Sequence, residues 1–282
     1  MTAEKSILIT GCSSGIGLCV AQGLQQRGYR VFATARRAED VKALAEQGLE
    51  SLALDLDDSD SIQAAVDEVL ERTGGQLFAL FNNGAYGQPG AVEDLTRDVL
   101  RRELETNLLG WLELTNRLIP VMREQGEGRI LQNSSVLGLV ALPYRGAYNC
   151  SKFALEGLTD TLRLELAGTD IHVSLVEPGP ITSRFRENAY RAFKANIDPE
   201  HSAHRAYYEA VDRRLADQQK KAPFTLPPEA VLEKVIHALE SPKPKVRYYV
   251  TFPTHLFAWL KRLLPHRALD RVLLRVSRGE NR

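Results

Sequence analysis

A tyrosine and a lysine near the middle of the chain have the types and the spacing of a proton-transfer pair. Tyr148 and Lys152 are four residues apart in a segment of helical pattern, so the phenol and the ammonium share one helix face. A free tyrosine has a pKa of about 10. A fixed cation nearby favours the phenolate and is expected to lower that pKa, which would make the phenol a competent general acid or base. Taken alone, the same spacing also fits an ordinary surface pair.

A serine upstream is the expected partner of this pair. Ser135 lies thirteen residues before Tyr148 and closes a predicted strand at 129–133. Its hydroxyl can donate a hydrogen bond to a carbonyl oxygen that gains negative charge during a reaction. The neighbouring Ser134 is less well spaced for this role.

A glycine-rich segment near the N-terminus follows the first predicted strand and opens a helix. Its sequence is Thr-Gly-Cys-Ser-Ser-Gly-Ile-Gly over residues 10–17. Glycine is needed where the chain turns sharply and where the backbone approaches a pyrophosphate, to which a helix N-terminus offers unpaired N–H groups. A turn that needs glycine for its conformation alone is the alternative, but the strand–loop–helix context favours a dinucleotide site. The expected contacts are Gly11, Ser13, Ser14, Gly15, Ile16 and Gly17.

The end of the second predicted strand indicates which dinucleotide binds. An acidic residue about 20 positions past the glycines would hold the ribose 2′-hydroxyl of NAD. Ala35 lies near that position, and Arg36 and Arg37 follow it. A guanidinium forks onto a 2′-phosphate, so we predict NADP, although two arginines can also simply solvate a loop. Asp55, with Leu56 beside it, is placed to reach an adenine edge or else to cap the next helix.

Short apolar runs alternate with helical patterns along most of the chain. This alternation implies βαβ units and an α/β fold: a doubly wound, Rossmann-like parallel sheet of about seven strands with helices on both faces. Right-handed crossovers bring every strand's carboxyl end to one edge, where ligands bind. The predicted strands are 6–10, 30–35, 50–54, 77–81, 129–133, 171–176 and 247–251, and the predicted helices are 16–27, 38–47, 59–72, 97–123, 146–167 and 228–240.

Together with the glycine loop, the Tyr-x-x-x-Lys pair matches a known pattern. Over about residues 5–185 the chain resembles the short-chain dehydrogenase/reductases. The resemblance implies a seven-stranded doubly wound sheet and a homodimer or homotetramer. It implies that Tyr148 is the catalytic acid/base, that Lys152 lowers its pKa and binds the nicotinamide ribose, and that Ser135 positions the substrate oxygen. Asn107 is similar to the family's helix asparagine, which supports a proton-relay water; without the resemblance it would be a locally bonded amide.

Two segments depart from the family's pattern. The family's Asn-Asn-Ala-Gly appears as Asn-Asn-Gly-Ala over residues 82–85, where Asn83 and Gly84 are the expected cofactor contacts. The family's Pro-Gly-x-Val-x-Thr appears as Pro-Gly-Pro-Ile-Thr-Ser over residues 178–183. A hydroxyl there would reach the nicotinamide carboxamide, and either Ser183 or Thr182 can supply it. The expected contacts in this segment are Pro178, Gly179, Ile181 and Ser183.

The C-terminal third is an elaboration of the same domain, which spans residues 1–282. By resemblance, residues 185–225 form a mobile substrate lid, whose aromatic side chains either wall an apolar cleft or pin the lid to the core. Residues 254–282 are a basic tail with apolar side chains at helical spacing. This tail either lies on a membrane surface or packs on the protein's own body or on a partner subunit.

Composition narrows the remaining function classes. The chain has 36 Lys+Arg against 36 Asp+Glu and 44% hydrophobic residues, which is typical of a folded globular protein. A net charge of zero provides no field that would gather nucleic acid. Three cysteines without a C-x-x-C motif fit reduced thiols in the cytoplasm, and no secretory signal or transmembrane span is seen. His201 and His204 lack the further ligands that a metal site needs, so no metal is expected.

These observations predict an NADP(H)-dependent oxidoreductase. It would interconvert an aldehyde or ketone, expected to be lipophilic, and the corresponding alcohol by hydride transfer, with Tyr148 as the proton donor and acceptor. A non-catalytic protein that senses NADP and regulates a partner is the alternative, although a sensor has no need of a proton donor. The expected location is the cytoplasm, with peripheral membrane contact if the tail binds lipid.

Overall fold

The structure of the chain is a computed structural model that describes residues 5–216 and 222–280. Seven parallel strands lie in the order β3-β2-β1-β4-β5-β6-β7. The strands are β1 (Ser6–Ile9), β2 (Arg30–Ala35), β3 (Glu50–Ala53), β4 (Ala79–Asn82), β5 (Gly128–Asn133), β6 (Ile171–Glu177) and β7 (Arg247–Tyr249). The predicted doubly wound, Rossmann-like parallel sheet is confirmed. The order reverses at β1, so the carboxyl ends of β1 and β4 open a crevice for a ligand.

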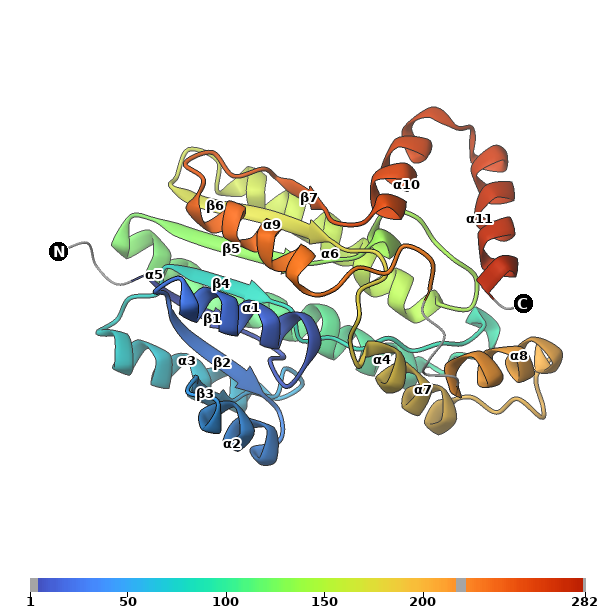
Figure 1. The fold of residues 1–282 in the computed structure, drawn as a ribbon, viewed down its shortest axis with the longest axis horizontal. Coiled ribbons are helices and arrows are strands. Elements are labelled where there is room, and N and C mark those ends of the chain that lie inside the picture. The colour runs from blue at the N-terminus through green and yellow to red at the C-terminus, as the bar shows by residue number, and fades with distance from the viewer. Residues whose placement is uncertain (1–4, 217–221, 281–282) are drawn as a thin grey trace.

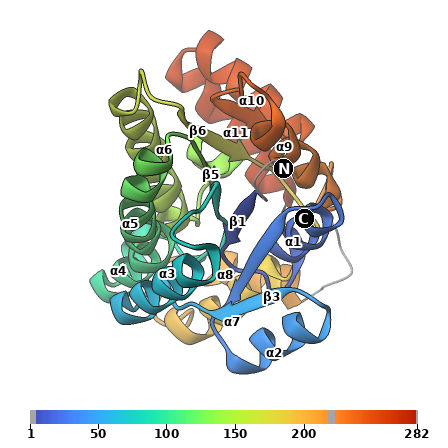
Figure 2. The same ribbon diagram turned by 90° about the vertical axis from the view of Figure 1, so that its left-hand side faces the viewer.

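Helices cover both faces of the sheet (Figure 1, Figure 2). The apolar sides of α1, α2 and α9 pack on one face, and those of α3, α5 and α6 pack on the other. Both faces are therefore buried, which explains why the strands are nearly continuous apolar runs. The bounds of these helices are α1 (Gly15–Gln26), α2 (Ala38–Glu46), α3 (Ser59–Thr73), α5 (Gly110–Gln125), α6 (Gly146–Glu165) and α9 (Glu229–Glu240).

The long helix expected at 97–123 is interrupted. It consists of α4 (Arg97–Leu104), one π-helical turn (Glu105–Leu109) and α5, which runs on through Pro120. A π turn adds a residue to the helical repeat and is often found at functional sites. Here the turn contains the buried Asn107.

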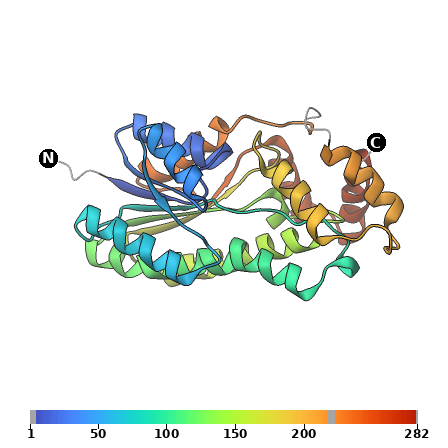
Figure 3. The same cartoon turned by 90° about the horizontal axis from the view of Figure 1, so that it is seen from below.

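Two pairs of C-terminal helices lie beyond the carboxyl edge of the sheet (Figure 1, Figure 3). The first pair is α7 (Phe185–Asn196) and α8 (Arg205–Ala216), within the predicted lid. The second pair is α10 (Phe252–Leu263) and α11 (His266–Glu280), within the predicted tail. A short 3-10 turn, Val136–Gly138, follows β5 and packs under α10 and α11. The helical C-terminal extension is therefore as expected.

Candidate active site

The glycine loop after β1 is held against the segment that follows β4. The Thr10 hydroxyl accepts hydrogen bonds from the backbone N–H groups of Asn83 and Gly84, both at 2.8 Å. Gly11 has a φ of +70°, and a Cβ on it would lie 2.5 Å from the Gly84 Cα. A Cβ on Gly84 would in turn lie 3.2 Å from the Gly11 nitrogen, which explains why glycine precedes alanine in this chain. The two backbones pass too closely for side chains.

The same loop leaves the start of α1 open. A Cβ on Gly17 would lie 2.3 Å from the Gly11 carbonyl oxygen, so the loop closes tightly over the first turn of the helix. Ser14 is the N-cap residue, but its side chain makes no capping hydrogen bond in the described structure. The N–H groups of this helix start are thus available to a phosphate. The cradle of bare backbone and helix terminus fits a dinucleotide.

Residues 36 and 37, after β2, have different surroundings. Arg37 forms ion pairs with Glu39 at 2.9 Å and Asp40 at 2.8 Å. Arg36 is exposed and makes no hydrogen bond or ion pair within the described ranges. Of the two guanidinium groups, only that of Arg36 is left for a ligand.

The predicted adenine-side residues follow β3. The Asp55 carboxylate accepts a hydrogen bond from the Asp57 N–H at 3.1 Å. Asp58, and not Asp55, caps α3 through the Asp60 N–H, so the alternative role of Asp55 as a helix cap is wrong. Leu56 is buried beneath the loop, within reach of Gly84 and of Gly110 on α5.

The three predicted catalytic side chains come together at the carboxyl end of β5. Lys152 is fully buried on α6, and its Nζ donates a hydrogen bond to the Asn133 carbonyl oxygen at 2.8 Å. The same Nζ lies 5.7 Å from the centre of the Tyr148 ring and 4.3 Å from that of Trp111. The Tyr148 hydroxyl is hydrogen-bonded to Ser135, whose Oγ also accepts the Leu137 N–H at 3.1 Å.

Burial has the largest effect on the pKa values of Tyr148 and Lys152. Although part of the Tyr148 ring is exposed, the protein surrounds its hydroxyl, and this burial raises the pKa of Tyr148 well above its usual value, while the Ser135 hydrogen bond lowers it to a lesser degree. Burial also lowers the pKa of Lys152 to about 7. The expected lowering of the tyrosine's pKa is therefore wrong for this structure, because desolvation favours the neutral form of both groups.

Asn107 is fixed on both sides by its own chain. Its Nδ2 donates to the Tyr86 carbonyl oxygen at 2.8 Å and to Glu103 Oε1 at 3.0 Å, and its Oδ1 accepts the Tyr86 N–H at 3.1 Å. Its Nδ2 also lies 3.3 Å from the Ser151 Oγ, one residue before the lysine. The π turn thus directs the Asn107 amide toward the catalytic helix.

Glu103 is a site residue that sequence analysis did not identify. Its carboxyl is fully buried on α4, and its Oε2 has no hydrogen-bond partner among the described residues. Burial raises the pKa of Glu103 to about 8, against an opposing effect of the Lys152 charge. The one feature of the sequence that could have identified Glu103 is its spacing, because it lies four residues before Asn107 on the same predicted helix face. Charged residues on solvent-exposed helix faces often have the same spacing, so the spacing alone does not distinguish a site residue.

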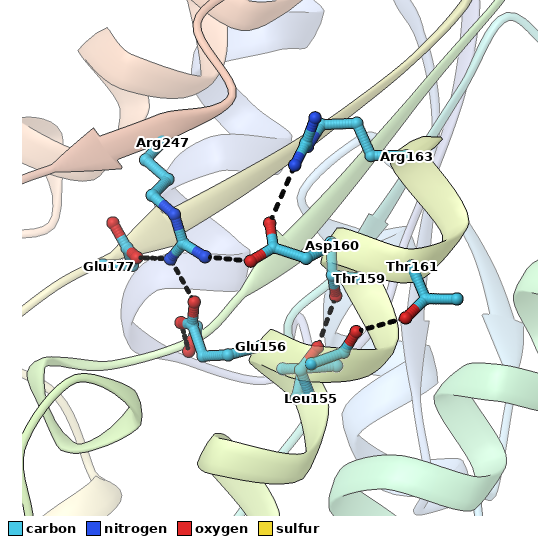
Figure 4. Close-up of polar contacts among 10 residues, drawn as sticks. Leu155, Glu156, Thr159, Asp160, Thr161, Arg163, Glu177 and Arg247 are labelled. Atoms are coloured by element: carbon cyan, nitrogen blue, oxygen red, sulfur yellow. Dashed lines mark hydrogen bonds and ion pairs between the residues drawn. The ribbon is translucent and has the colours of Figure 1, made fainter. Parts of the chain in front are cut away.

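A second cluster of charged side chains connects α6 with the ends of β6 and β7 (Figure 4). Arg247 on β7 bonds to Glu156 and Asp160 on α6 and, at 2.5 Å, to Glu177 at the end of β6. Glu156 accepts the hydroxyl of Ser134, so this serine is occupied in the cluster while Ser135 faces the tyrosine. Burial and the Glu156 charge raise the pKa of Glu177. Sequence analysis missed this cluster.

The segment after β6 reaches the glycine loop. The Pro178 carbonyl oxygen accepts the Val136 N–H at 2.8 Å, which ties this segment to the turn after Ser135. A Cβ on Gly179 would lie 2.2 Å from the Thr251 Oγ1, and Ile181 pairs with Leu226. A Cβ on Gly15 would lie 2.8 Å from the Ser183 Cβ. Ser183 is therefore the hydroxyl beside the phosphate loop.

The lid aromatics divide between the two expected roles. Phe193, Tyr207 and Tyr208 pack together with Tyr144 and Ala91, and so pin α7 and α8 to the body. Phe185 instead contacts the catalytic tyrosine edge to face, with 5.3 Å between its ring centre and that of Tyr148. It is 37% exposed, so it forms a wall between the site and solvent.

The two lid histidines have protein partners. His204 contacts Glu93 and, at 3.2 Å, the Tyr144 hydroxyl, and His201 contacts Asp198 at 2.7 Å. Across residues 5–216 and 222–280, no three His, Cys, Asp or Glu side chains gather as metal ligands.

The fold and this constellation define a nucleotide-dependent oxidoreductase of the doubly wound class, and comparison with known proteins identifies the family. The family model described as short chain dehydrogenase matches residues 5–193. The chain therefore belongs to the short-chain dehydrogenases. This family binds NAD(P) and interconverts carbonyls and alcohols.

Several curated relatives match along most of the chain. It is 42% identical to the uncharacterized oxidoreductase YbbO of Escherichia coli K12, over 96% of this chain and 94% of that protein. It is 36% identical to human 17-beta-hydroxysteroid dehydrogenase type 1, over 88% and 78% of the two chains. It is also 36% identical to mouse retinol dehydrogenase 5, over 96% and 88%.

Solved structures show the same architecture. A short-chain dehydrogenase from Streptomyces avermitilis superposes with a TM-score of 0.77 at 28% identity, over 99% of both chains. Actinorhodin polyketide ketoreductase with NADPH superposes with a TM-score of 0.71 at 29% identity, over 88% of this chain and 95% of that one.

Proposed function

We propose that the protein is an NADP(H)-dependent oxidoreductase that interconverts a lipophilic aldehyde or ketone and its alcohol. The observation that carries the proposal is the convergence of Tyr148, Ser135 and Lys152 at the end of β5, beside the glycine loop. A sensor of NADP would need the loop but not a hydrogen-bonded phenol next to a buried lysine.

The proposed reaction assigns a task to each side chain. When bound, a reduced nicotinamide supplies the hydride for carbonyl reduction. Ser135 donates a hydrogen bond to the carbonyl oxygen and holds it next to the Tyr148 hydroxyl. Tyr148 gives its proton to that oxygen as negative charge develops, and Lys152 in its ammonium form stabilises the phenolate that remains. The raised pKa of Tyr148 keeps it protonated, and so able to donate, at neutral pH.

The surroundings of the site favour an apolar substrate. Leu137, Val140 and Leu142 lie in one apolar cluster with the Tyr148 ring, and Phe185 covers the ring from the lid side. The names of two relatives point the same way, since a steroid and retinol are both lipophilic. We therefore propose a lipophilic substrate.

The coenzyme proposal rests on one arginine. Arg36 follows β2, where an NAD-binding chain would place an acidic residue, and its guanidinium is available to a 2′-phosphate. NADPH use would favour carbonyl reduction in the cell. We also propose that the protein is cytoplasmic, which the three free cysteines support. We further propose that it forms a homodimer or homotetramer.

The experiment is to follow NADPH oxidation with a panel of aldehydes and ketones. We expect Tyr148→Phe to lower kcat by about 10²- to 10⁴-fold, because the general acid is lost. The matched control is Tyr29→Phe, since Tyr29 precedes β2 at the opposite edge of the sheet. Wild-type turnover by Tyr148→Phe would remove this mechanism. Tight NADPH binding without turnover of any carbonyl would support the NADP-sensing alternative instead.

A further inference from the structure

The C-terminal helix pair, α10 and α11, joins the active site to an outer surface. Its inner side belongs to an apolar cluster in which Phe257 and Leu273 pack on Leu137 and Leu142, with the Tyr148 ring at the margin. The helix pair lies at one end of the molecule, beyond the sheet (Figure 1). The inner side of the helix pair thus adjoins the residues that surround the catalytic ring.

The outer face of α10 is apolar and open. Phe252, Trp259 and Leu263 are 58%, 60% and 56% exposed, and their i, i+7, i+11 spacing puts them on one helix face. Phe224, 59% exposed, extends the face, with its ring centre 5.2 Å from that of Phe252. Single exposed apolar side chains are common, but three on one helix face, with a fourth packed against the first, indicate a binding surface. We call these four residues the α10 strip.

The C-terminal helix pair is strongly basic. Residues 252–278 contain six Lys and Arg and a single acidic residue, Asp270, while the whole chain is neutral. Arg262 is exposed on the same side of α10 as the strip. On α11, four arginines face solvent while the opposite side packs inward: Arg267, Arg271, Arg275 and Arg278.

Exposed aromatic and aliphatic side chains on the same helix pair as several exposed arginines match the chemistry of an anionic lipid surface. The apolar groups enter the boundary between headgroups and acyl chains, and the guanidinium groups pair with phosphates. A symmetric contact between two copies of this chain would instead bring the two arginine faces toward each other, at an electrostatic cost. No helix within the described ranges is long and apolar enough to cross a membrane.

We propose that α10 and α11 dock the protein on the surface of an anionic phospholipid bilayer. The α10 strip inserts at the interface, and the arginines of α11 contact the headgroups. This docking does not depend on the identity of the substrate. If the substrate is lipophilic, docking would open the apolar cluster around Tyr148 toward the membrane.

The test is flotation of the full chain with vesicles of phosphatidylcholine alone or mixed with phosphatidylglycerol. We expect binding only to the anionic vesicles, and weaker binding as salt screens the arginines. Trp259→Glu combined with Leu263→Glu should weaken vesicle binding by about tenfold or more. The matched control is Leu164→Glu on α6, because Leu164 is an equally exposed leucine (65%) that lies outside the C-terminal helices.

Two further measurements keep the result interpretable. Circular dichroism melting curves should show the same Tm for the double variant and for wild type, since both substituted side chains are exposed. Failure of the wild-type chain to float with anionic vesicles, or equal flotation of the folded double variant, would overturn the proposal. Light scattering gives the oligomeric state of both proteins. If the wild-type chain is an oligomer that binds no vesicles, and the double variant is a monomer, the strip is instead a contact with a second copy of the chain.

Discussion

At the scale of single residues, the two arginines after β2 illustrate what structure adds to a pattern. They are adjacent in sequence, but Arg37 is paired with Glu39 and Asp40 while Arg36 is left for a ligand. We predict that Arg36→Leu lowers kcat/KM with NADPH by about 10- to 100-fold and leaves the value with NADH nearly unchanged, because charge-assisted bonds to the 2′-phosphate are lost. Steady-state kinetics with both coenzymes check this.

The neighbouring residue is a control for that experiment. Arg37→Leu removes the same charge from the same loop, yet its guanidinium is engaged by acidic side chains. Arg37→Leu should lower kcat/KM with NADPH much less than Arg36→Leu does. If Arg36→Leu lowered kcat/KM by the same factor with NADPH and with NADH, Arg36 would not recognise the 2′-phosphate.

The buried carboxyl near the catalytic lysine leads to a prediction about pH. Burial lowers the pKa of Lys152 to about 7 and raises that of Glu103 to about 8, so the carboxyl is largely neutral where the lysine titrates. Reduction should slow as pH rises through the pKa of Lys152, because the ammonium that stabilises the Tyr148 phenolate is lost. Glu103→Gln replaces a largely neutral carboxyl with a neutral amide, so the alkaline limb should move by much less than one pH unit.

The measurement is kcat/KM for carbonyl reduction across the pH range, for wild type and Glu103→Gln. Glutamine keeps the shape of the side chain and can still accept the Asn107 hydrogen bond, so packing is preserved. Glu124→Gln, at an exposed position on α5, is the control and should leave the profile unchanged. An alkaline limb that moves down by a full pH unit in Glu103→Gln would show instead that Glu103 is ionised and stabilises the Lys152 ammonium.

At the scale of elements, Arg247 connects a strand, a helix and the end of the neighbouring strand. Its guanidinium bonds to carboxylates on α6 and at the end of β6, and Glu177 is completely buried. We predict that Arg247→Met destabilises the fold by about 3–5 kcal/mol at neutral pH, because buried carboxylates lose their cation. Urea unfolding measures this. The exposed pair Arg27–Glu240 is the control, since Arg27→Met should lower the stability far less than Arg247→Met does.

The pH dependence of this defect has a definite sign. Without Arg247, the pKa of Glu177 in the folded state rises further above its unfolded value, so the folded protein binds more protons. The deficit should therefore be smaller at pH 5 than at pH 8. Adding Glu177→Gln to Arg247→Met should recover part of the stability at pH 8. A deficit that does not change with pH would mean that lost packing, rather than uncompensated charge, causes it.

Local patterns predict the elements well, and long-range contacts poorly. β2 has its predicted bounds, residues 30–35, because an apolar run between polar turns marks a buried strand. The helix predicted at 97–123 contains a π turn that the sequence did not predict, because one extra residue in a helix barely changes the spacing of its apolar residues. Arg247 and Glu156 lie 91 positions apart, so no local pattern could pair them. Tyr148 and Lys152 were predictable because one helical turn relates them.

At the scale of the whole molecule, function is gathered at one edge of the sheet. The glycine loop, Ser135 and the Pro178 segment follow β1, β5 and β6, whose carboxyl ends lie at the same edge of the sheet because all the strands are parallel. The C-terminal helices lie beyond the same edge (Figure 3). In a chain whose net charge is zero, residues 252–278 of this extension carry six Lys and Arg against one acidic residue.

The π turn at Glu105–Leu109 makes the active site sensitive to chain length. An α-helix advances by about 100° per residue, so loss of one residue here would rotate everything that precedes the deletion by that angle relative to α5. Asn107 and Glu103 would swing away from the lysine while Trp111 stayed in place. Over evolutionary time, substitutions in this segment should be tolerated far more often than gaps.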